Sequence, residues 1–465
     1  MQYISTRGSA QALGFEGATL AGLASDGGLY VPESWPQFSR ADIAALAGLS
    51  YAETAVRVLA PFVGDALSEE ELRDLCEAAY GRFSHKAVTP LVQLDERNWL
   101  LELFHGPTLA FKDVALQLLG LLFERFLSGK DRHLTVVGAT SGDTGSAAID
   151  ALAGREKVDI FMLHPKGRVS EVQRRQMTTV LAPNVHNIAI EGNFDDAQRL
   201  VKAMFGDAQF ADRFTLSAVN SINWARLAAQ IVYYFYSAVR LGAPDRAIAF
   251  SVPTGNFGDV FAGYAAAQMG LPVARLIVAT NVNDILHRAM VAGDYSVGEL
   301  TPTPAPSMDI QVSSNFERLL FDLYDRDGDI LSSVMSSFET SRALKLDDRA
   351  HSRIGKLFSS ARIDNDAMSM AMRHAASEMG EIIDPHTAIG LSAAISADLA
   401  PDIPIVTLAT AHPAKFRDAV ERATGQRPAL PARISGLFER EERYDTLPGE
   451  LQAIEAYIAE RATET

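Results

Sequence analysis

The sequence predicts an α/β fold in which a mainly parallel sheet is covered by helices on both faces. From about residue 98 onward, short continuous apolar runs alternate with helical stretches, which is typical of parallel strands buried on both faces. In addition, two of these runs end in glycine-rich loops that lead directly into helices. Ligands of such folds bind at the carboxyl ends of the strands, so the chemistry should lie where these strands end.

The N-terminal region, residues 1–95, is expected to be small and mostly helical. Residues 26–32 contain Asp-Gly-Gly followed by Leu-Tyr-Val-Pro, which indicates a turn into a short extended piece. Residues 51–63 and 68–83 have apolar side chains at helical spacing. We expect this region to pack against the remainder of the chain.

The core is expected in residues 96–300 and 385–430. Residues 301–384 should form a mostly helical insertion that begins with a proline-rich connection, and residues 431–465 a charged helical tail. The strands that we expect, each a short apolar run, are 99–102, 134–139, 159–163, 185–190, 215–219, 247–252, 275–279 and 405–409.

Composition excludes several classes of function. The chain has 465 residues, of which 48% are hydrophobic and 22% charged, with a formal net charge of -16. That charge argues against binding to nucleic acid or to an anionic membrane. The single cysteine, Cys76, allows no internal disulfide and indicates a reducing compartment, so we expect a cytoplasmic location. No signal peptide, no membrane span and no metal-binding pattern is expected.

The run His105-Gly-Pro-Thr-Leu-Ala-Phe-Lys-Asp113 is the most informative stretch of the chain. It places Lys112 among apolar and small residues, after a Gly-Pro turn and before a helix-forming run. Burial lowers the pKa of a lysine, and the resulting free amine is what Schiff-base chemistry with an aldehyde cofactor needs. The alternative is a solvated lysine at the start of a helix.

Two glycine loops share one pattern. Residues 136–148 and 250–262 each read as a strand, a loop of glycine and hydroxyl residues, and the start of a helix. Free N–H groups at a helix N-terminus, approached closely through glycine, make an anion site. Neither loop fits the P-loop or the dinucleotide pattern. We therefore expect two anion sites, for two phosphates or for a phosphate and a carboxylate.

Thr410 stands where the last predicted strand stops. Its hydroxyl could bond a ring nitrogen of a ligand, or it could cap the helix that follows. The same ambiguity holds for His412 and Lys415, and the sequence leaves both interpretations open.

Taken together, these motifs resemble those of threonine synthase in its longer bacterial and fungal form. The resemblance rests on blocks in the family's order at 3–8, 103–113, 139–146, 220–226, 253–259, 306–310 and 409–415. It implies a pyridoxal-phosphate enzyme of fold type II, the tryptophan-synthase-β-like class. Such an enzyme has two mainly parallel open sheets flanked by helices, with the cofactor between its two subdomains.

The resemblance also implies a reaction and roles for residues. O-phospho-L-homoserine and water would become L-threonine and phosphate, the last step of threonine biosynthesis. Lys112 resembles the lysine that holds pyridoxal 5'-phosphate as a Schiff base and moves protons. Thr410 resembles the partner of the pyridine nitrogen. The positions that resemble the family's loop for the cofactor phosphate and ring are Gly255, Asn256, Phe257, Gly258 and Asp259.

Substrate contacts are predicted at two places. The loop of Thr140, Ser141, Asp143 and Thr144 is the candidate for the substrate carboxylate. Candidates for the substrate phosphate and a nearby polar contact are Lys166, Arg168, Arg226 and Asn223, although Arg and Lys usually lie at the surface.

Three other functions remain open at this stage. One is a lyase on the same scaffold that eliminates phosphate and releases a 2-keto acid. Another is a serine or threonine dehydratase, whose substrate carries no phosphate. The third is a non-catalytic binding protein, which would have no need of Lys112. We expect a monomer or a homodimer.

Overall fold

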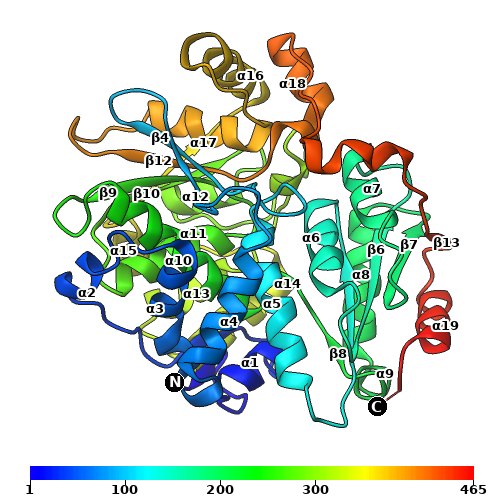
Figure 1. The fold of residues 1–465 in the computed structure, drawn as a ribbon. Helices are drawn as coiled ribbons and strands as arrows, with labels where there is room; N and C mark the ends of the chain where they lie inside the picture. Colours follow the sequence, from blue (N-terminus) through cyan, green and yellow to red (C-terminus); the bar gives the residue numbers. More distant parts are fainter. Residues whose placement is uncertain (465) are drawn as a thin grey trace.

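Two mainly parallel sheets organise the computed structural model, which describes residues 1–464 (Figure 1). The first sheet has the order β11-β10-β9-β12-β4-β3, and the second has the order β13-β7-β6-β5-β8. Every neighbouring pair is parallel except β3 with β4. The strands of the first sheet are β3 (Leu91–Gln93), β4 (Asn98–Glu102), β9 (Ile248–Pro253), β10 (Val273–Thr280), β11 (Phe358–Arg362) and β12 (Ile405–Ala409). Those of the second are β5 (Leu134–Ala139), β6 (Val158–Pro165), β7 (Val185–Ile190), β8 (Leu216–Ser217) and β13 (Asp445–Leu447).

All eight strands expected from the apolar runs are present, although β8 is shorter than expected. Three further strands of these two sheets were missed, namely β3, β11 and β13. β3, at the end of the N-terminal region, pairs with β4. β11 lies within the insertion that was expected to be mostly helical, and β13 lies within the C-terminal tail; both are edge strands. Their sequences, Phe-Ser-Ser-Ala-Arg and Asp-Thr-Leu, contain no continuous apolar run, because an edge strand is not buried on both sides. The division of the chain into domains stays a prediction.

The N-terminal region is held by a small antiparallel sheet of β1 (Tyr3–Ser5) and β2 (Tyr30–Pro32). The predicted helices are confirmed as α3 (Tyr51–Val63) and α4 (Glu69–Tyr80), and each begins with a Ser–Glu capping box. α1 (Phe15–Ala21) and α2 (Arg40–Ala44) complete this region. The region packs on α5 (Lys112–Leu127) and α10 (Trp224–Arg240), as expected.

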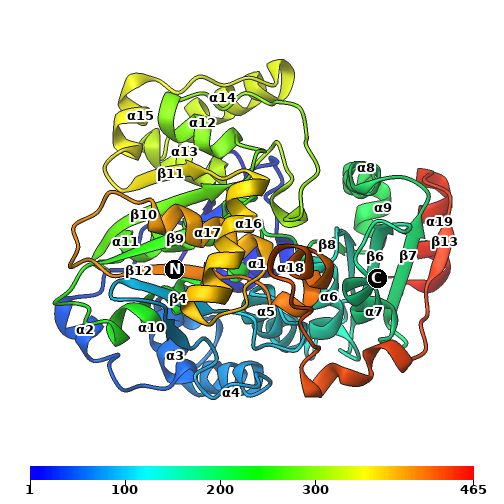
Figure 2. The same cartoon turned by 90° about the horizontal axis from the view of Figure 1, so that it is seen from above.

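Helices cover both sheets, and α5 and α6 (Asp143–Leu152) lie where the two halves of the molecule meet (Figure 2). α10 is buried along nearly its whole length, consistent with its largely apolar sequence. No helix within the described residues is long and apolar enough to cross a membrane. The remaining helices are α7 (Glu171–Thr178), α8 (Phe194–Gly206), α9 (Ala208–Arg213), α11 (Gly258–Gln268), α12 (Ile285–Ala292), α13 (Phe316–Leu323), α14 (Gly328–Ser341), α15 (Asp348–Ile354), α16 (Asn365–His374), α17 (Pro385–Ile395), α18 (Arg417–Thr424) and α19 (Leu451–Arg461).

Candidate active site

Lys112 is the first residue of α5, and the turn before it is tightly built. Leu109 adopts a left-handed conformation with φ 65°. The carboxylate of Asp113 accepts hydrogen bonds from the Thr108 backbone N–H at 2.8 Å and from the Thr108 hydroxyl at 2.7 Å. These bonds fold the turn back onto the first turn of α5, so the backbone at Lys112 is held in place.

A substitution at Gly106 tests how much this turn contributes to stability and to cofactor binding. A Cβ atom on Gly106 would lie 2.4 Å from the Cβ of Asp113, which no side-chain rotation can relieve. We expect Gly106→Ala to lower the free energy of unfolding by about 2 kcal/mol and to weaken cofactor binding, measured by urea unfolding and visible absorbance. Gly206→Ala is the matched control, because its new Cβ would meet nothing within 4 Å. Equal stability of the two variants would contradict this account of the turn.

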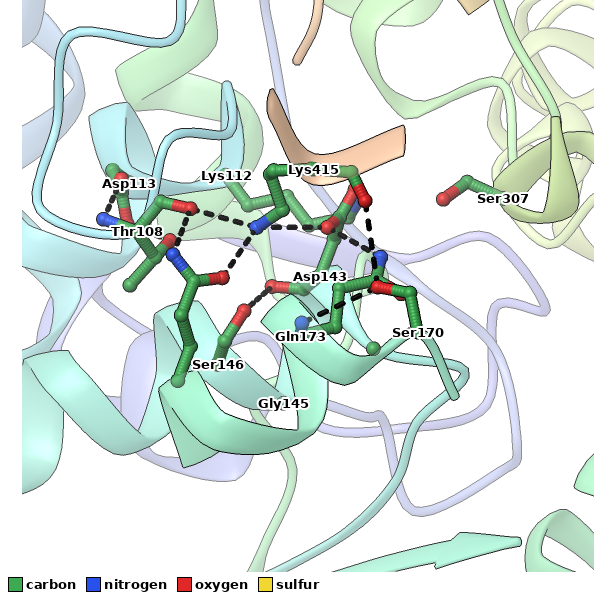
Figure 3. A network of polar contacts seen from close by, with 12 residues as sticks. Thr108, Lys112, Asp113, Asp143, Gly145, Ser146, Ser170, Gln173, Ser307 and Lys415 are labelled. Atoms are coloured by element: carbon green, nitrogen blue, oxygen red, sulfur yellow. Dashed lines mark hydrogen bonds and ion pairs between the residues drawn. The ribbon is translucent and has the colours of Figure 1, made fainter. Parts of the chain in front are cut away.

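Lys112 faces a buried cluster of charges (Figure 3). Its Nζ lies 3.7 Å from Oδ2 of Asp143, the first residue of α6. The other oxygen of Asp143, Oδ1, is 2.9 Å from Nζ of Lys415 and accepts a 2.8 Å hydrogen bond from Gln173. Lys112, Asp143 and Lys415 are all buried. The interpretation of Lys112 as a solvated lysine is therefore wrong.

Burial sets the proton affinity of this cluster. Desolvation lowers the pKa of the Lys112 amine, and the positive charges of Arg226 and Lys415 lower it further, while Asp143 opposes them. Burial alone would raise the pKa of Asp143, but the two lysines outweigh it and hold that pKa well below its ordinary value. The result is an ionised carboxylate beside a lysine that gives up its proton readily.

The 255–259 loop presents free donors at the start of α11. Within the described residues, the backbone N–H groups of Gly255, Asn256 and Gly258 donate to no protein group. Phe257 has a left-handed φ of 61°, which turns the chain into the helix. A Cβ on Gly255 would lie 2.7 Å from the carbonyl oxygen of Ser307, so only glycine fits there. Unpaired N–H groups at a helix N-terminus fit a phosphate.

Asp259 is buried in the first turn of α11. Its Oδ1 accepts 2.9 Å hydrogen bonds from the Thr254 hydroxyl and from the Val260 N–H. Burial raises the pKa of Asp259 to about 6, against an ordinary value of 3.8, although these hydrogen bonds oppose the change. The folded protein therefore binds this proton more tightly than the unfolded chain does.

This proton affinity predicts a dependence of stability on pH. The stabilisation is fully present below about pH 4 and is lost as the pH rises through about 6. Asp259→Asn keeps an acceptor oxygen but cannot ionise. Between pH 4 and 7, the free energy of unfolding of the cofactor-free variant should fall less than that of the parent, by about 2 kcal/mol. Parallel urea-unfolding results over this range would contradict the prediction.

The 140–144 loop is built in a similar way. The Thr140 hydroxyl accepts hydrogen bonds from the N–H groups of Gly142 and Gly145, both at 2.9 Å, and so shapes the loop from inside. The N–H groups of Ser141, Asp143 and Thr144 have no partner within the described residues. This leaves donors for an anion close to Lys112, whereas both acceptor sites of the Thr140 hydroxyl are used within the loop.

Thr410 lies beside the lysine, since its carbonyl oxygen accepts a 2.8 Å hydrogen bond from the N–H of Phe111. The helical turn after it, Pro413–Phe416, is capped by the side chain of His412, so capping by Thr410 is wrong. In the part of the chain that the structure describes, the Thr410 hydroxyl has no hydrogen-bond partner. It is free to bond a ligand.

The four remaining candidates divide into two kinds. Arg226 is buried on α10, its charge acts on Lys112, and its Nε has no partner within the described residues. Asn223 is buried too, but its amide donates to the Thr19 carbonyl and accepts from the Ala225 N–H, so it caps α10. Lys166 and Arg168 are exposed after β6, and the structure does not bring them into the buried cluster.

Sequence reasoning missed part of the cluster. Lys415 was left ambiguous, and Gln173 and Ser307 were not singled out. Figure 3 shows Ser307 across from the cluster, and its N–H donates to Nε2 of His386 at 3.3 Å. The sequence signal for Lys415 was that it follows a predicted strand, in the same segment as Thr410.

Comparison with known proteins agrees with this geometry. A family model described as pyridoxal-phosphate dependent enzyme matches residues 83–361, and models described as the threonine synthase N terminus and C-terminal part match residues 2–80 and 387–458. Threonine synthase of Pseudomonas aeruginosa is 55% identical over 99% of this chain and 98% of that protein. Two solved structures, the PLP-bound threonine synthase of Brucella melitensis and the yeast threonine synthase, match with TM-scores of 0.96 and 0.93. Their identities are 51% and 39%; each match covers 99% of this chain, and 99% and 98% of the solved chains.

The fold, the buried Lys112 and the free donors of the 255–259 loop thus define a pyridoxal-phosphate-dependent enzyme of fold type II. More narrowly, the chain belongs to the threonine synthase family. The expected fold, family and cofactor are confirmed.

Proposed function

We propose that this protein converts O-phospho-L-homoserine and water to L-threonine and phosphate, using pyridoxal 5'-phosphate. The observation that carries the proposal is a buried Lys112 amine that faces Asp143 and lies close to two loops with unpaired N–H groups. The names of the relatives support a threonine synthase over the alternative lyase.

The residues divide the work between cofactor and substrate. The N–H groups of the 255–259 loop would hold the cofactor phosphate, Lys112 would take its aldehyde, and the Thr410 hydroxyl would face its ring nitrogen. When bound, this cofactor supplies a carbonyl for the substrate amine and a ring that draws electron density from the substrate Cα.

Lys112 is the proton carrier in this proposal. Once its amine is released, it removes the proton from Cα and then moves a proton from Cβ of the substrate. The C–O bond at Cγ breaks and phosphate leaves with the electron pair. A proton is delivered to Cγ, the hydroxyl of water adds at Cβ, and Lys112 returns a proton to Cα. A lysine with a lowered pKa suits both directions of transfer, because it is neither strongly basic nor permanently protonated.

The carboxylate and the phosphate of the substrate would bind at different parts of the site. The N–H groups of Ser141, Asp143 and Thr144 would bind the carboxylate, and the Arg226 guanidinium would bind the phosphate. Thr140 would act through the shape of the loop, and Asn223 through the placement of α10. We infer no role at the reaction centre for Lys166 or Arg168, which are exposed. A cytoplasmic location and a monomeric or homodimeric state stay predictions.

The origin of the product oxygen tests this route. In water enriched in oxygen-18, addition at Cβ places the label in the hydroxyl of threonine and leaves the released phosphate unlabelled. Label in the phosphate would mean attack at phosphorus, as in a phosphatase, and would contradict the proposal. Mass spectrometry of both products distinguishes the two outcomes.

A further inference from the structure

Lys415 is a second buried lysine at the site, and every donor of its ammonium group is used. Its Nζ lies 2.7 Å from the carbonyl oxygen of Thr108, 2.9 Å from Oε1 of Gln176 and 2.9 Å from Oδ1 of Asp143. An ammonium has three N–H donors, so these three acceptors satisfy it completely. Lys415 therefore has no donor left for a substrate or a cofactor, and its function must be exerted through the groups that it holds.

The carboxylate of Asp143 is oriented by these contacts. Oδ1 receives both Lys415 and the amide of Gln173, which leaves Oδ2 without a hydrogen bond from the described residues. Oδ2 is the oxygen that lies 3.7 Å from Nζ of Lys112. Since the carboxylate is planar, fixing Oδ1 fixes the direction in which Oδ2 points.

The contact also joins the two halves of the molecule. Lys415 follows β12 of the first sheet, in the segment that begins with Thr410, whereas Asp143 begins α6, which follows β5 of the second sheet. The pair is buried on both sides, and a buried ion pair is costly to form unless its geometry is well satisfied. Because burying the Lys415–Asp143 pair is costly and the pair lies directly beside Lys112, we infer that it has a role at the site.

From these contacts we propose that Lys415 is a positioning residue, which holds Asp143 so that Oδ2 faces the Lys112 amine and which balances the charge of that carboxylate. The proposal rests on Lys112 being the lysine that takes the cofactor. Four charged groups act on Lys112: Asp143 and Asp259 favour its protonated form, and Arg226 and Lys415 oppose it. Loss of Lys415 leaves Asp143 paired with Lys112 alone, so Lys112 keeps its proton to higher pH.

The protonation state of Lys112 can be followed by the rate at which the cofactor-free protein takes up pyridoxal phosphate. Only the free amine of Lys112 adds to the aldehyde, so the rate of gain of visible absorbance, followed from pH 6 to 10, reports the fraction of free amine. In Lys415→Met we expect the midpoint to move upward by about one pH unit, a roughly tenfold slower uptake below the midpoint. In Asp143→Asn we expect the midpoint to move downward, because the carboxylate that favours the ammonium form is gone.

One control variant and one alternative variant of Lys415 separate positioning from simple loss of packing. Gln176→Leu removes one acceptor of the same ammonium, together with the 3.0 Å hydrogen bond from Gln176 to the Thr108 carbonyl oxygen. It leaves the charge of Lys415 and its contact with Asp143, so the midpoint should stay where it is in the parent protein. If Lys415→Met does not fold, Lys415→Gln removes the charge with a smaller loss of packing and is measured in the same way. An unchanged midpoint in the folded Lys415 variant, or an equal change in Gln176→Leu, overturns the proposal. Uptake with the same visible absorbance by Lys112→Ala would instead show that Lys112 is not the cofactor lysine.

Discussion

Lys112→Ala should lose both the visible absorbance of the lysine-linked cofactor and at least about 10³-fold of the turnover. Two separate roles make this the largest effect expected of any substitution. In the proposed function, the Lys112 amine attaches the cofactor, and the same amine carries protons between substrate carbons. Neither role has a substitute, because the neighbouring Lys415 amine is fully occupied by three acceptors.

Absorbance spectra and the rate of phosphate release together check this expectation. Lys202→Ala is the matched control, since Lys202 is exposed on α8, and it should keep both properties of the parent protein. A Lys112→Ala protein with the parent spectrum and the parent rate would remove the basis of the whole site assignment.

Arg226→Met should lower kcat/KM for O-phospho-L-homoserine by about 10²-fold or more while the cofactor spectrum is retained. The guanidinium makes a 2.7 Å hydrogen bond to the carbonyl oxygen of Val219, but its Nε has no partner within the described residues. Burial lowers the pKa of Arg226 to about 10, which marks a cation without a nearby counter-charge. It also lies in the first turn of α10, where the helix dipole disfavours a positive charge.

A phosphate would supply the missing counter-charge. The free protein should therefore tolerate Arg226→Met with little change in the free energy of unfolding, while substrate binding suffers. Arg226→Lys, which keeps the charge but not the planar pair of donors, should recover part of the lost kcat/KM. Parent kinetics in Arg226→Met would show that the substrate phosphate binds elsewhere.

Much of the fold could be predicted because strands buried on both faces of a parallel sheet have mainly apolar sequences. The runs at β5 and β12 are mainly apolar, and the structure places strands there. β11 and β13 have no such apolar run, because edge strands can be polar. The motif Tyr3–Gly8 was recognised only by resemblance, and its role is structural: Thr6 and Arg7 bond Glu317 of α13, which ties the N-terminus to the insertion.

Some residues of the site could also be predicted from local sequence, whereas others depend on the tertiary structure. Lys112 and the 255–259 loop are marked by local sequence, because two glycine loops before helices occur together with a lysine in an apolar setting. Arg226, Lys166 and Arg168 look alike in the sequence, and only burial separates Arg226 from the two exposed residues. The pairing of Lys415 with Asp143 depends on how the segment after β12 meets the start of α6, which no local pattern encodes.

The stoichiometry of the reaction tests the central claim most directly. The purified, cofactor-loaded protein is incubated with O-phospho-L-homoserine, and phosphate, threonine and 2-oxobutanoate are quantified over time. The account predicts phosphate and threonine in equal amounts, with Lys112→Ala producing neither. Phosphate accompanied by 2-oxobutanoate in place of threonine, or no release of phosphate by the loaded protein, would contradict it.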